Sequence, residues 1–324
     1  MLPTVRQMQY FVALAQHRSF VRAARACHVT QSSLSAAIRQ LEAALGAELV
    51  DRSGRALALT EAGERVLARA VTILREVEDL AACARSARTP LSGRLRLGVI
   101  PSIAPFLLPQ ALPDLRRAHP ELRLVLREEL SRVLVRDLRE GRLDVLLIAL
   151  PYDIGDLACE VIGRDRLLAA LPEGHVLARP GAIPLARLAR EPLLLLEDGH
   201  CLRDHVLSAF AGTPPPLESD EIQASSMTTL VQMADNGLGV TLVPEIAVEA
   251  GITRGTRLTV FPIADGAAAR DLGVVWRRRS AHAADAQALA AALKDHLARR
   301  AAPDRTAMAT DPHGSGASGI GVPA

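Results

Sequence analysis

The stretch HVTQSSLSAAIRQLEAALG, residues 28–46, has the pattern of a short helix with two different faces. Its apolar face consists of residues at helical spacing: Leu34, Ile38, Leu41 and Leu45. Thr30 is suited to cap the first turn, and Gly46 is a residue type that ends helices in a left-handed conformation. The other face carries small or hydrogen-bonding side chains: Gln31, Ser32, Ser33, Ser35 and Arg39. Such a polar face suits entry into the major groove of DNA.

The residues on either side predict the remaining parts of a winged helix-turn-helix module over residues 1–60. Upstream, residues 5–15 have helical apolar spacing, and Ser19 can cap a second short helix. Downstream, ELVDRSGRALALT (residues 48–60) predicts two short strands around a Ser53-Gly54 turn. Residues 1–60 contain seven arginines and three acidic residues, an excess that favours contact with phosphates. The alternative is a three-helix interaction module with a solvated charged face.

A long helix is predicted from Thr60 to about Arg88. Apolar residues recur along it at alternating intervals of four and three: Val66, Ala70, Ile73, Val77, Leu80 and Ala84. This is a heptad pattern, so residues 61–90 are predicted to be a dimerising linker. A dimer would place two recognition helices on two half-sites of DNA. The alternative is a helix that packs on its own domain.

The segment FVALAQHRSFVRAARACHVTQSSLSAAIRQLEAALGAELVDRSGRALALTEAG, residues 11–63, resembles the DNA-binding domain of LysR-type transcriptional regulators. The shared elements include LE..LG..L..R and LT.AG. The resemblance implies that the polar face described above contacts base edges or phosphates. It also implies that Arg52 and Arg55, in the wing, lie near the DNA backbone. Many members of the family have proline at the position of Ser32.

After a linker, TPLSG (residues 89–93), strands alternate with helices. A strand is predicted within RLRLGVIP (residues 94–101), further strands at 122–128, 143–150 and 193–196, and helices at 104–119 and 131–140. Such alternation implies an α/β fold with mainly parallel sheets. The segment ADNGLGVTLVPEIAV (residues 234–248) fits a helix end, a glycine turn and a buried strand.

The family resemblance implies the same architecture for residues 91–301, an α/β effector domain similar to periplasmic binding proteins. Its first subdomain would comprise about 91–162 and 264–301, and its second about 163–263, with a cleft between them. Most LysR-type regulators hold a small organic effector in this cleft. The whole chain is therefore expected to be multi-domain, with an all-α winged helix-turn-helix domain, a linker helix and this effector domain.

Cys201 begins a predicted helix, CLRDHVLSAFAG, residues 201–212. Amide groups and the helix dipole at a helix N-terminus favour a thiolate, which is the form that attacks peroxide and first gives a sulfenic acid. His200 could donate a hydrogen bond to it. The alternative is an inert core cysteine, which is the commoner fate of a single cysteine among apolar residues.

Three stretches resemble the peroxide-sensing OxyR branch of the family: GVIPSIAPFLLPQALPDL, LLLLEDGHCLRD and SSMTTLVQMADNGLGVTLVP. The resemblance covers residues 1 to about 298. It implies that Cys201 is the peroxide-reacting nucleophile and His200 its neighbour. Ser102 and Asp204 would orient peroxide or move its protons, and Arg270 would supply positive charge. Thr228 and Thr229 would line the site.

One position departs from that branch. Its second, resolving cysteine would fall at Phe210 in this chain, and residues 202–324 contain no cysteine. Cys201 could stop at sulfenic acid or be capped by a small thiol, which is the preferred interpretation. It could pair with Cys159, or it could be a vestige in a regulator of another signal. Cys27 and Cys83 are interpreted as structural thiols, and Phe210 as a core residue.

The function expected from these features is a DNA-binding transcription regulator, a peroxide-responsive activator of antioxidant genes. The alternatives are a regulator of the same family with an organic effector in the cleft, and a thiol peroxidase enzyme. The expected partners are operator DNA, RNA polymerase, hydrogen peroxide as signal, and a second copy or three further copies of the chain. No cofactor, metal or membrane contact is expected, the location is predicted to be cytoplasmic, and residues 302–324 are predicted to be disordered.

Overall fold

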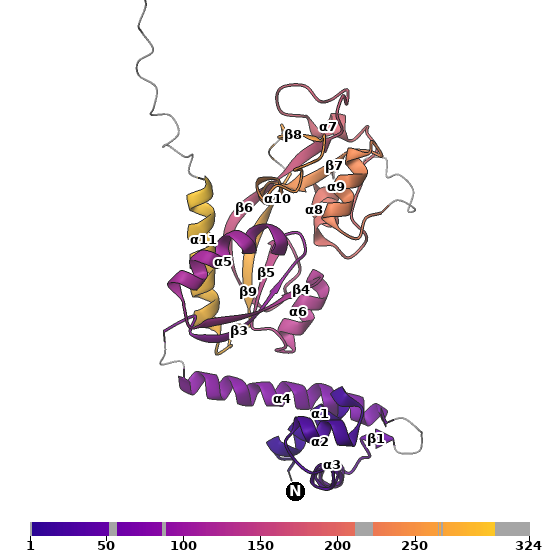
Figure 1. Cartoon of the computed structure of the whole chain (residues 1–324), viewed down its shortest axis with the longest axis vertical. Coiled ribbons are helices and arrows are strands. Elements are labelled where there is room, and N and C mark those ends of the chain that lie inside the picture. Colours follow the sequence, from indigo (N-terminus) through magenta and orange to yellow (C-terminus); the bar gives the residue numbers. More distant parts are fainter. Residues whose placement is uncertain are drawn as a thin grey trace, which may run out of the picture.

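The computed structural model describes residues 2–51, 57–85, 89–210, 223–264, 266 and 268–301, with no account of the side chains at 75, 78, 79, 81–85 and 301. Several sequence predictions therefore lie outside what the structure describes: the Ser53-Gly54 turn, the placement of Arg52 and Arg55, the side chains of Cys83 and Ala84, and the disorder of residues 302–324. The described chain forms an N-terminal module of helices, a long helix and a larger C-terminal α/β module (Figure 1).

The N-terminal module begins with three short helices: α1 (Val5–His17), α2 (Phe20–Ala26) and α3 (Gln31–Leu45). The predicted caps are confirmed. Ser19 and Thr30 each accept a hydrogen bond from the backbone N–H three residues later, and Gly46 ends α3 at φ 66°. Leu34, Ile38 and Leu41 are buried in the core of this module. The sequence signals suffice here because each of them acts within a few residues of the helix end.

The wing consists of β1 (Val50–Asp51) and β2 (Ala58–Leu59), which pair antiparallel, as predicted. Glu42 ties it to α3, because its Oε1 accepts from the backbone N–H groups of Leu49 and Val50 at 3.0 and 3.3 Å. Thr60 Oγ1 donates to the carbonyl oxygen of Glu48 at 2.7 Å. A Cβ atom at Gly63 would overlap the carbonyl oxygen of Leu49. These contacts explain the glutamate of LE..LG and the threonine and glycine of LT.AG.

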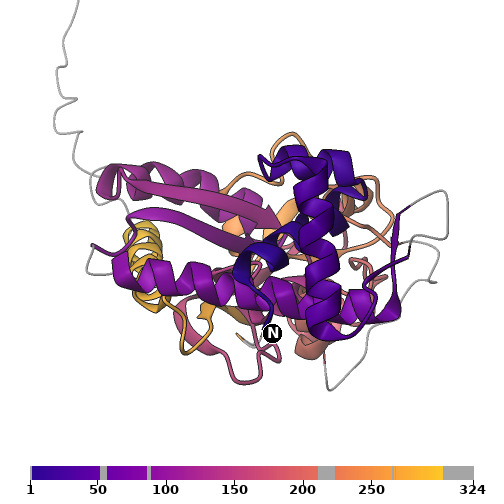
Figure 2. The same cartoon turned by 90° about the horizontal axis from the view of Figure 1, so that it is seen from below.

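Helix α4 (Glu61–Arg85) leaves the N-terminal module and runs beneath the C-terminal module, and Figure 2 shows it from below. The predicted heptad residues divide into two groups. Val66 packs against the core of the N-terminal module, and Ala70 is buried. Ile73, Val77 and Leu80 are 45%, 37% and 70% exposed. The first turns therefore pack on their own domain, while the later turns present an apolar surface.

The C-terminal module has the following elements in chain order: β3 (Gly93–Val99), α5 (Ala104–Ala118), β4 (Leu122–Glu128), α6 (Ser131–Arg139), β5 (Val145–Leu150), β6 (Ala158–Leu171), α7 (Leu185–Leu188), α8 (Cys201–Ala209), α9 (Met227–Asp235), β7 (Thr241–Pro244), α10 (Glu245–Glu249), β8 (Thr259–Phe261), β9 (Ala269–Trp276) and α11 (Ala283–Ala301). The largest hydrophobic cluster runs from β3 to α11. As predicted, residues 234–248 contain a helix end, a glycine turn and the buried strand β7.

The prediction of mainly parallel sheets is wrong. The strand order is β4-β3-β5-β9-β6-β7, with β8 pairing β6. Among the strands of the described residues, the parallel pairs are those of β3 with β4 and β5, whereas β9 lies antiparallel to both β5 and β6, and β6 is antiparallel to β7 and β8. The physical reason is the path of the chain. It leaves the first half of the module along β6 and returns along β9, so these two strands must run in opposite directions.

The predicted strand at residues 193–196 is not formed. Its ends make isolated parallel bridges, Leu193 with Val240 and Leu196 with Ala224, and all four leucines of this segment are buried. A short apolar run has the same composition whether it pairs along its length or only at its ends. The sequence was sufficient to predict that residues 193–196 are buried, but not which residues they pair with.

Candidate functional site

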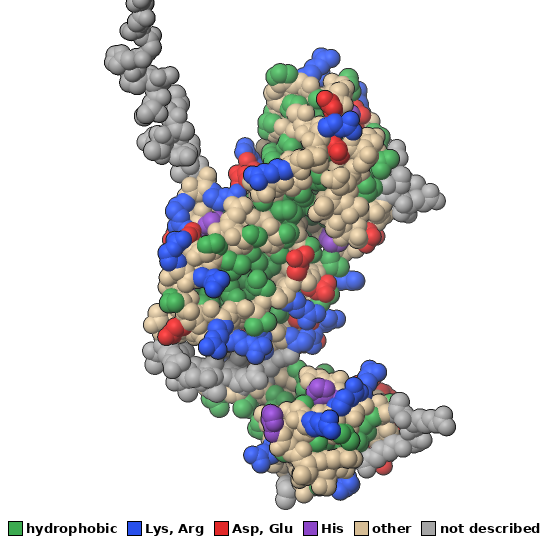
Figure 3. Space-filling model, in the orientation of Figure 1, with side chains coloured by type: hydrophobic (Ala, Val, Ile, Leu, Met, Phe, Trp, Pro, Cys, Tyr) green, Lys and Arg blue, Asp and Glu red, His purple; other side chains and the backbone are tan. Residues whose placement is uncertain are grey.

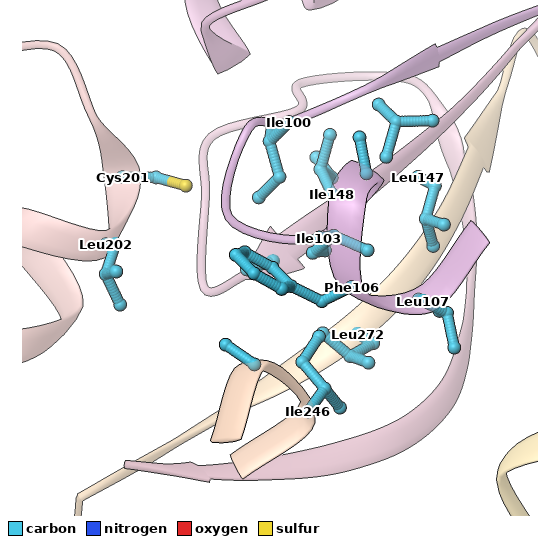
Figure 4. Packing of buried hydrophobic residues seen from close by; sticks show 14 of the residues in the cluster. Ile100, Ile103, Phe106, Leu107, Leu147, Ile148, Cys201, Leu202, Ile246 and Leu272 are labelled. Carbon is cyan, nitrogen blue, oxygen red and sulfur yellow. The ribbon is translucent and has the colours of Figure 1, made fainter. Parts of the chain in front are cut away.

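Cys201 is the first residue of α8 and is 5% exposed. Its side chain points from α8 toward Ile100, which follows β3 (Figure 4). A small cavity opens beside it, lined by Ile100, Pro101, Ser102, Leu130, Ser131, His200, Cys201 and Leu202. The cavity volume of about 10 Å³ leaves room for about one water-sized molecule. The structure thus brings together Cys201, His200 and Ser102, three of the residues singled out in the sequence.

Arg270 lies behind this cavity with its side chain fully buried. Its Nη1 donates to Ser102 Oγ at 2.7 Å, and its Nη2 donates to the Ser102 carbonyl oxygen at 3.0 Å. Because Ser102 Oγ accepts from the arginine, its own hydrogen remains available to a molecule in the cavity. Arg270 is therefore connected to the cavity through Ser102.

Asp165, on β6, holds the remaining side of Arg270 and was missed by the sequence reasoning. Its Oδ2 accepts from Arg270 Nε at 2.9 Å, and both side chains are 0% exposed. Its Oδ1 accepts from the backbone N–H of Ile246 at 3.1 Å. A buried charge without a partner is strongly unfavourable, so if Arg270 is buried, an acidic side chain is expected close to it. The sequence contains no signal that this acid is Asp165, 105 residues away.

Ser131, a polar residue of the cavity lining, was also missed by the sequence reasoning. It is the first residue of α6 and is 1% exposed. Its Oγ hydrogen-bonds with no described residue, yet it faces the Cys201 sulfur closely enough to lower the pKa of that thiol. The contact is therefore weaker than a full hydrogen bond. A serine at the start of a predicted helix would ordinarily be taken as a cap, which hides this role.

The pKa of the Cys201 thiol is raised above its ordinary value, because burial disfavours the thiolate. Asp204 raises it further, while Ser131, the positive charge of Arg270 and the thiol's own backbone N–H oppose the rise. Burial also lowers the pKa of His200, so that side chain is neutral near pH 7. The resting site thus contains a neutral thiol and neutral hydroxyl and imidazole groups, with one buried arginine behind them.

Besides Arg270, three predicted pocket residues lie outside the cavity lining. Asp204 is exposed on α8, and its effect on Cys201 is electrostatic. Thr228 and Thr229 are exposed in the first turn of α9, where Thr229 Oγ1 lies 3.0 Å from Ser226 Oγ. Their roles toward peroxide stay predictions.

Phe210, at the position of the resolving cysteine, is 3% exposed in the core, as predicted. Cys159 lies on β6, whereas the cavity begins directly after β3, and β5 and β9 separate these strands. Three strand spacings amount to about 14 Å, and the Cα atoms of a disulfide are about 7 Å apart at most. A Cys201–Cys159 disulfide would therefore require the module to rearrange. Burial raises the pKa of the Cys159 thiol as well.

The candidate DNA-binding face lies on α3. Gln31, Ser32, Ser33 and Arg39 are exposed, and Ser35 is partly exposed. Arg39 Nη1 donates to Ser35 Oγ at 2.9 Å, one helical turn apart. The sequence-predicted polar face therefore exists as one continuous surface. Figure 3 shows basic side chains on the visible surface of the N-terminal module and along the lower edge of the C-terminal module.

Among the described residues, no group of three or more His, Cys, Asp or Glu side chains could hold a metal ion. None of the helices in the described part of the chain is long and apolar enough to cross a membrane.

Two family models match the chain. Residues 5–64 match the lysR family of bacterial regulatory helix-turn-helix proteins, and residues 88–298 match the LysR substrate binding domain. A probable hydrogen peroxide-inducible genes activator of Streptomyces viridosporus is 39% identical, over 91% of this chain and 95% of the relative. The HTH-type transcriptional regulator EstR of Acinetobacter baylyi is 38% identical, over 86% and 91%. The transcriptional dual regulator OxyR of Escherichia coli K12 is 36% identical, over 90% and 97%.

Solved structures of OxyR proteins share the fold. A full-length OxyR variant of Pseudomonas aeruginosa has a TM-score of 0.72 and 30% identity, covering 92% of this chain and 95% of that one. A Corynebacterium glutamicum OxyR mutant with hydrogen peroxide bound has a TM-score of 0.62 and 31% identity, covering 92% and 94%. One family model matches the N-terminal module and the other matches the C-terminal module. The two solved OxyR structures each cover 92% of this chain. The chain therefore belongs to the LysR family of DNA-binding transcriptional regulators.

Proposed function

We propose that this regulator responds to hydrogen peroxide through Cys201 and controls antioxidant genes, as an activator. The observation that carries the proposal is the cavity itself: a buried thiol, two serine hydroxyls and an arginine-bonded backbone carbonyl surround space for about one water-sized molecule. A cavity of this size suits a very small oxidant. The name of the Streptomyces relative and the peroxide-bound OxyR structure support the same signal.

The chemistry proposed for the site is oxidation of one thiol. The Cys201 thiolate attacks one peroxide oxygen, an S–O bond forms and the O–O bond breaks. The leaving hydroxide takes up a proton and becomes water. Sulfur loses two electrons, which reduce the peroxide. Ser102 and Ser131 can donate hydrogen bonds to the departing oxygen, and the Arg270 charge favours the thiolate that must form first.

The oxidised form proposed for Cys201 is sulfenic acid or a mixed disulfide with a small thiol. A thiol RSH would displace hydroxide from the sulfenic sulfur, forming an S–S bond and water. Phe210 cannot form a local disulfide, and Cys159 lies too far away in this arrangement. The cavity holds about one water-sized molecule, so we propose that the larger adduct displaces α8. That displacement is the proposed signal.

The experiment that tests the proposal is the intact mass of the full chain after stoichiometric peroxide. We expect the gain of one oxygen, located at Cys201, in the wild type and in Cys159→Ser, and no gain in Cys201→Ser. Transcription from the operator should lose its response to peroxide in Cys201→Ser alone. Loss of two hydrogens in the wild type but not in Cys159→Ser would replace the one-cysteine mechanism by a disulfide. An unchanged mass would refute peroxide sensing.

For DNA binding, we propose that α3 reads bases in the major groove and that Arg52 and Arg55 contact the backbone. Gln31→Ala or Ser33→Ala should change the preference among operator sequences, while Arg52→Ala should weaken binding to all of them alike. Arg52→Ala should also reduce the dependence of affinity on salt, because one fewer counterion is released. Binding of each variant to a panel of operators at several salt concentrations measures both effects. A change of sequence preference in Arg52→Ala would contradict this placement of the wing.

An organic effector is the second candidate signal, because the family resemblance implies a cleft of the kind in which most LysR-type regulators hold one. The cavity at Cys201 is too small for such a molecule, which would have to bind elsewhere in the C-terminal module.

The proposed function also includes formation of a homodimer or homotetramer and contact with RNA polymerase. Steady consumption of many equivalents of peroxide in the presence of a thiol reductant would instead indicate an enzyme.

A further inference from the structure

Asp165 and Arg270 form a buried ion pair in which both carboxylate oxygens accept a hydrogen bond. The two residues lie directly opposite each other on the antiparallel strands β6 and β9. Both carboxylate oxygens are used, Oδ2 by Arg270 Nε at 2.9 Å and Oδ1 by the Ile246 N–H at 3.1 Å. These bonds fix the position and the plane of the carboxylate. The chemistry proposed above uses Arg270 but not the acid.

The orientation of Arg270 follows from that of Asp165. A guanidinium group is planar, so fixing Nε also fixes the directions of the two Nη groups. Both Nη groups meet Ser102, one at its hydroxyl oxygen and one at its carbonyl oxygen, at 2.7 and 3.0 Å. Ser102 lines the cavity, and Asp165 does not. The hydrogen bonds thus connect Asp165 to the cavity lining through Arg270.

We propose that Asp165 is a positioning residue for the Cys201 cavity: it aims the Arg270 guanidinium at Ser102 and withholds part of the arginine's positive charge from the thiol. The proposal builds on the function proposed above for Cys201. It concerns the reactivity of the thiol toward any electrophile, so it can be tested without peroxide.

Electrostatics in a buried site support the second part of this role. Arg270 lowers the pKa of Cys201. A carboxylate in contact with the guanidinium cancels much of its charge as seen from the sulfur, and burial strengthens this effect because the dielectric constant is low. The other groups that act on the thiol charge are Asp204 on α8, Ser131 on α6 and Tyr152, and His200 lies beside it in the cavity lining. We expect all of them to keep their positions in a variant of Asp165.

The decisive variant is Asp165→Asn in the full-length protein, because it removes the charge and keeps the shape. The measurement is the rate at which iodoacetamide alkylates Cys201 as a function of pH, followed by mass spectrometry of the peptide that contains it. Without the compensating carboxylate, we expect the thiol pKa to fall and alkylation at pH 7 to become faster, about tenfold for each unit of pKa.

A double-mutant cycle tests whether the effect passes through the arginine. In an Arg270→Gln background, burial raises the pKa of the now unpaired Asp165 carboxyl, so that this group becomes neutral and Asp165→Asn should change the alkylation rate little. Glu245→Gln is the matched control. It removes one negative charge next to Ile246, but the partner of Glu245 is Arg166, so Cys201 should react as in the wild type. Circular dichroism and operator binding establish that each variant is folded.

Three outcomes would overturn the proposal: unchanged or slower alkylation in Asp165→Asn, an equal effect of that substitution in the Arg270→Gln background, or a matching effect of Glu245→Gln. If Asp165→Asn does not fold, Asp165→Ser replaces it, because a serine hydroxyl can still accept from the Ile246 N–H. Failure of both variants to fold would assign Asp165 to stability alone. A shifted alkylation profile in a protein that peroxide does not oxidise would support this role of Asp165 while refuting peroxide sensing.

Discussion

At the scale of single residues, His205 connects the helix that carries Cys201 to a distant loop. Its Nε2 donates to the carbonyl oxygen of Pro151 at 3.0 Å, so Nδ1 carries the lone pair. Nδ1 is buried, and no described residue hydrogen-bonds with it. Burial lowers the pKa of His205, and Arg270 lowers it further, whereas the Pro151 carbonyl and Asp204 act in the opposite direction. The folded protein therefore resists protonation at this site.

This resistance predicts that the C-terminal module loses stability in mild acid. Because the folded-state pKa of His205 lies below the unfolded value of 6.5, the unfolded chain binds more protons between the two. The contribution to stability is complete above about pH 6.5 and is lost as the pH falls toward the folded pKa. We expect the urea midpoint, followed by fluorescence of the single tryptophan Trp276, to decrease from pH 7.5 to pH 5.5.

The matched variant is His205→Gln, whose amide can donate to the Pro151 oxygen but does not titrate. It should reduce the acid-induced decrease without abolishing it, since burial lowers the pKa of His200 as well. His119→Gln, at the end of α5, should leave the decrease unchanged. An identical pH dependence in His205→Gln and the wild type would show that His205 does not contribute to it.

At the scale of elements, the joint between the wing and α4 depends on Gly63. A Cβ atom there would overlap the carbonyl oxygen of Leu49, a backbone atom that cannot move aside like the end of a side chain. Gly63→Ala should therefore separate α4 from the wing and cost about 1–3 kcal/mol in the N-terminal module. Faster hydrogen exchange in the first turn of α4 and weaker operator binding measure the effect.

The control for this joint is Glu64→Ala, at the next residue along α4, which is exposed. Its effect on stability should stay within about 0.5 kcal/mol, as is usual at surface positions. Equal hydrogen exchange in Gly63→Ala and Glu64→Ala would mean that the close approach of α4 to Leu49 is not needed.

At the scale of the whole molecule, the exposed apolar residues of α4 are the proposed dimer contact. Ile73, Val77 and Leu80 keep the heptad spacing beyond the point where α4 leaves its own module. Burying a leucine contributes about 1.5–3 kcal/mol, so Leu80→Gln should weaken association by about tenfold or more. Sedimentation equilibrium of the full chain checks this. Arg65→Gln, 73% exposed and off the heptad positions, should leave the association constant unchanged.

If Leu80→Gln associates as tightly as the wild type, the dimer contact lies on another part of the chain. Operator binding separates the two cases further. Loss of the α4 contact should lower affinity for a two-half-site operator much more than affinity for a single half-site, because only the former requires two linked modules.

Local signals in the sequence determined much of this protein. The caps at Ser19, Thr30 and Gly46, the burial of three apolar residues on α3 and the range of β4 are as predicted, because each depends on residues a few positions apart. Leu45, also predicted on the apolar face of α3, is 39% exposed. Phe210 was predictable as a core residue for the same reason. The identity of Cys201 as the thiol of interest also came from the local string EDGHCLRD.

Only the tertiary structure decided what surrounds that thiol. Ser102, Ser131, Asp165 and Arg270 come from four separate segments, namely the turn after β3, α6, β6 and β9, and their meeting depends on the path of the chain along β6 and back along β9. The same path set the antiparallel pairing that composition could not reveal. Contacts across a hundred residues are fixed by packing, and the spacing of residues along the sequence contains no record of them.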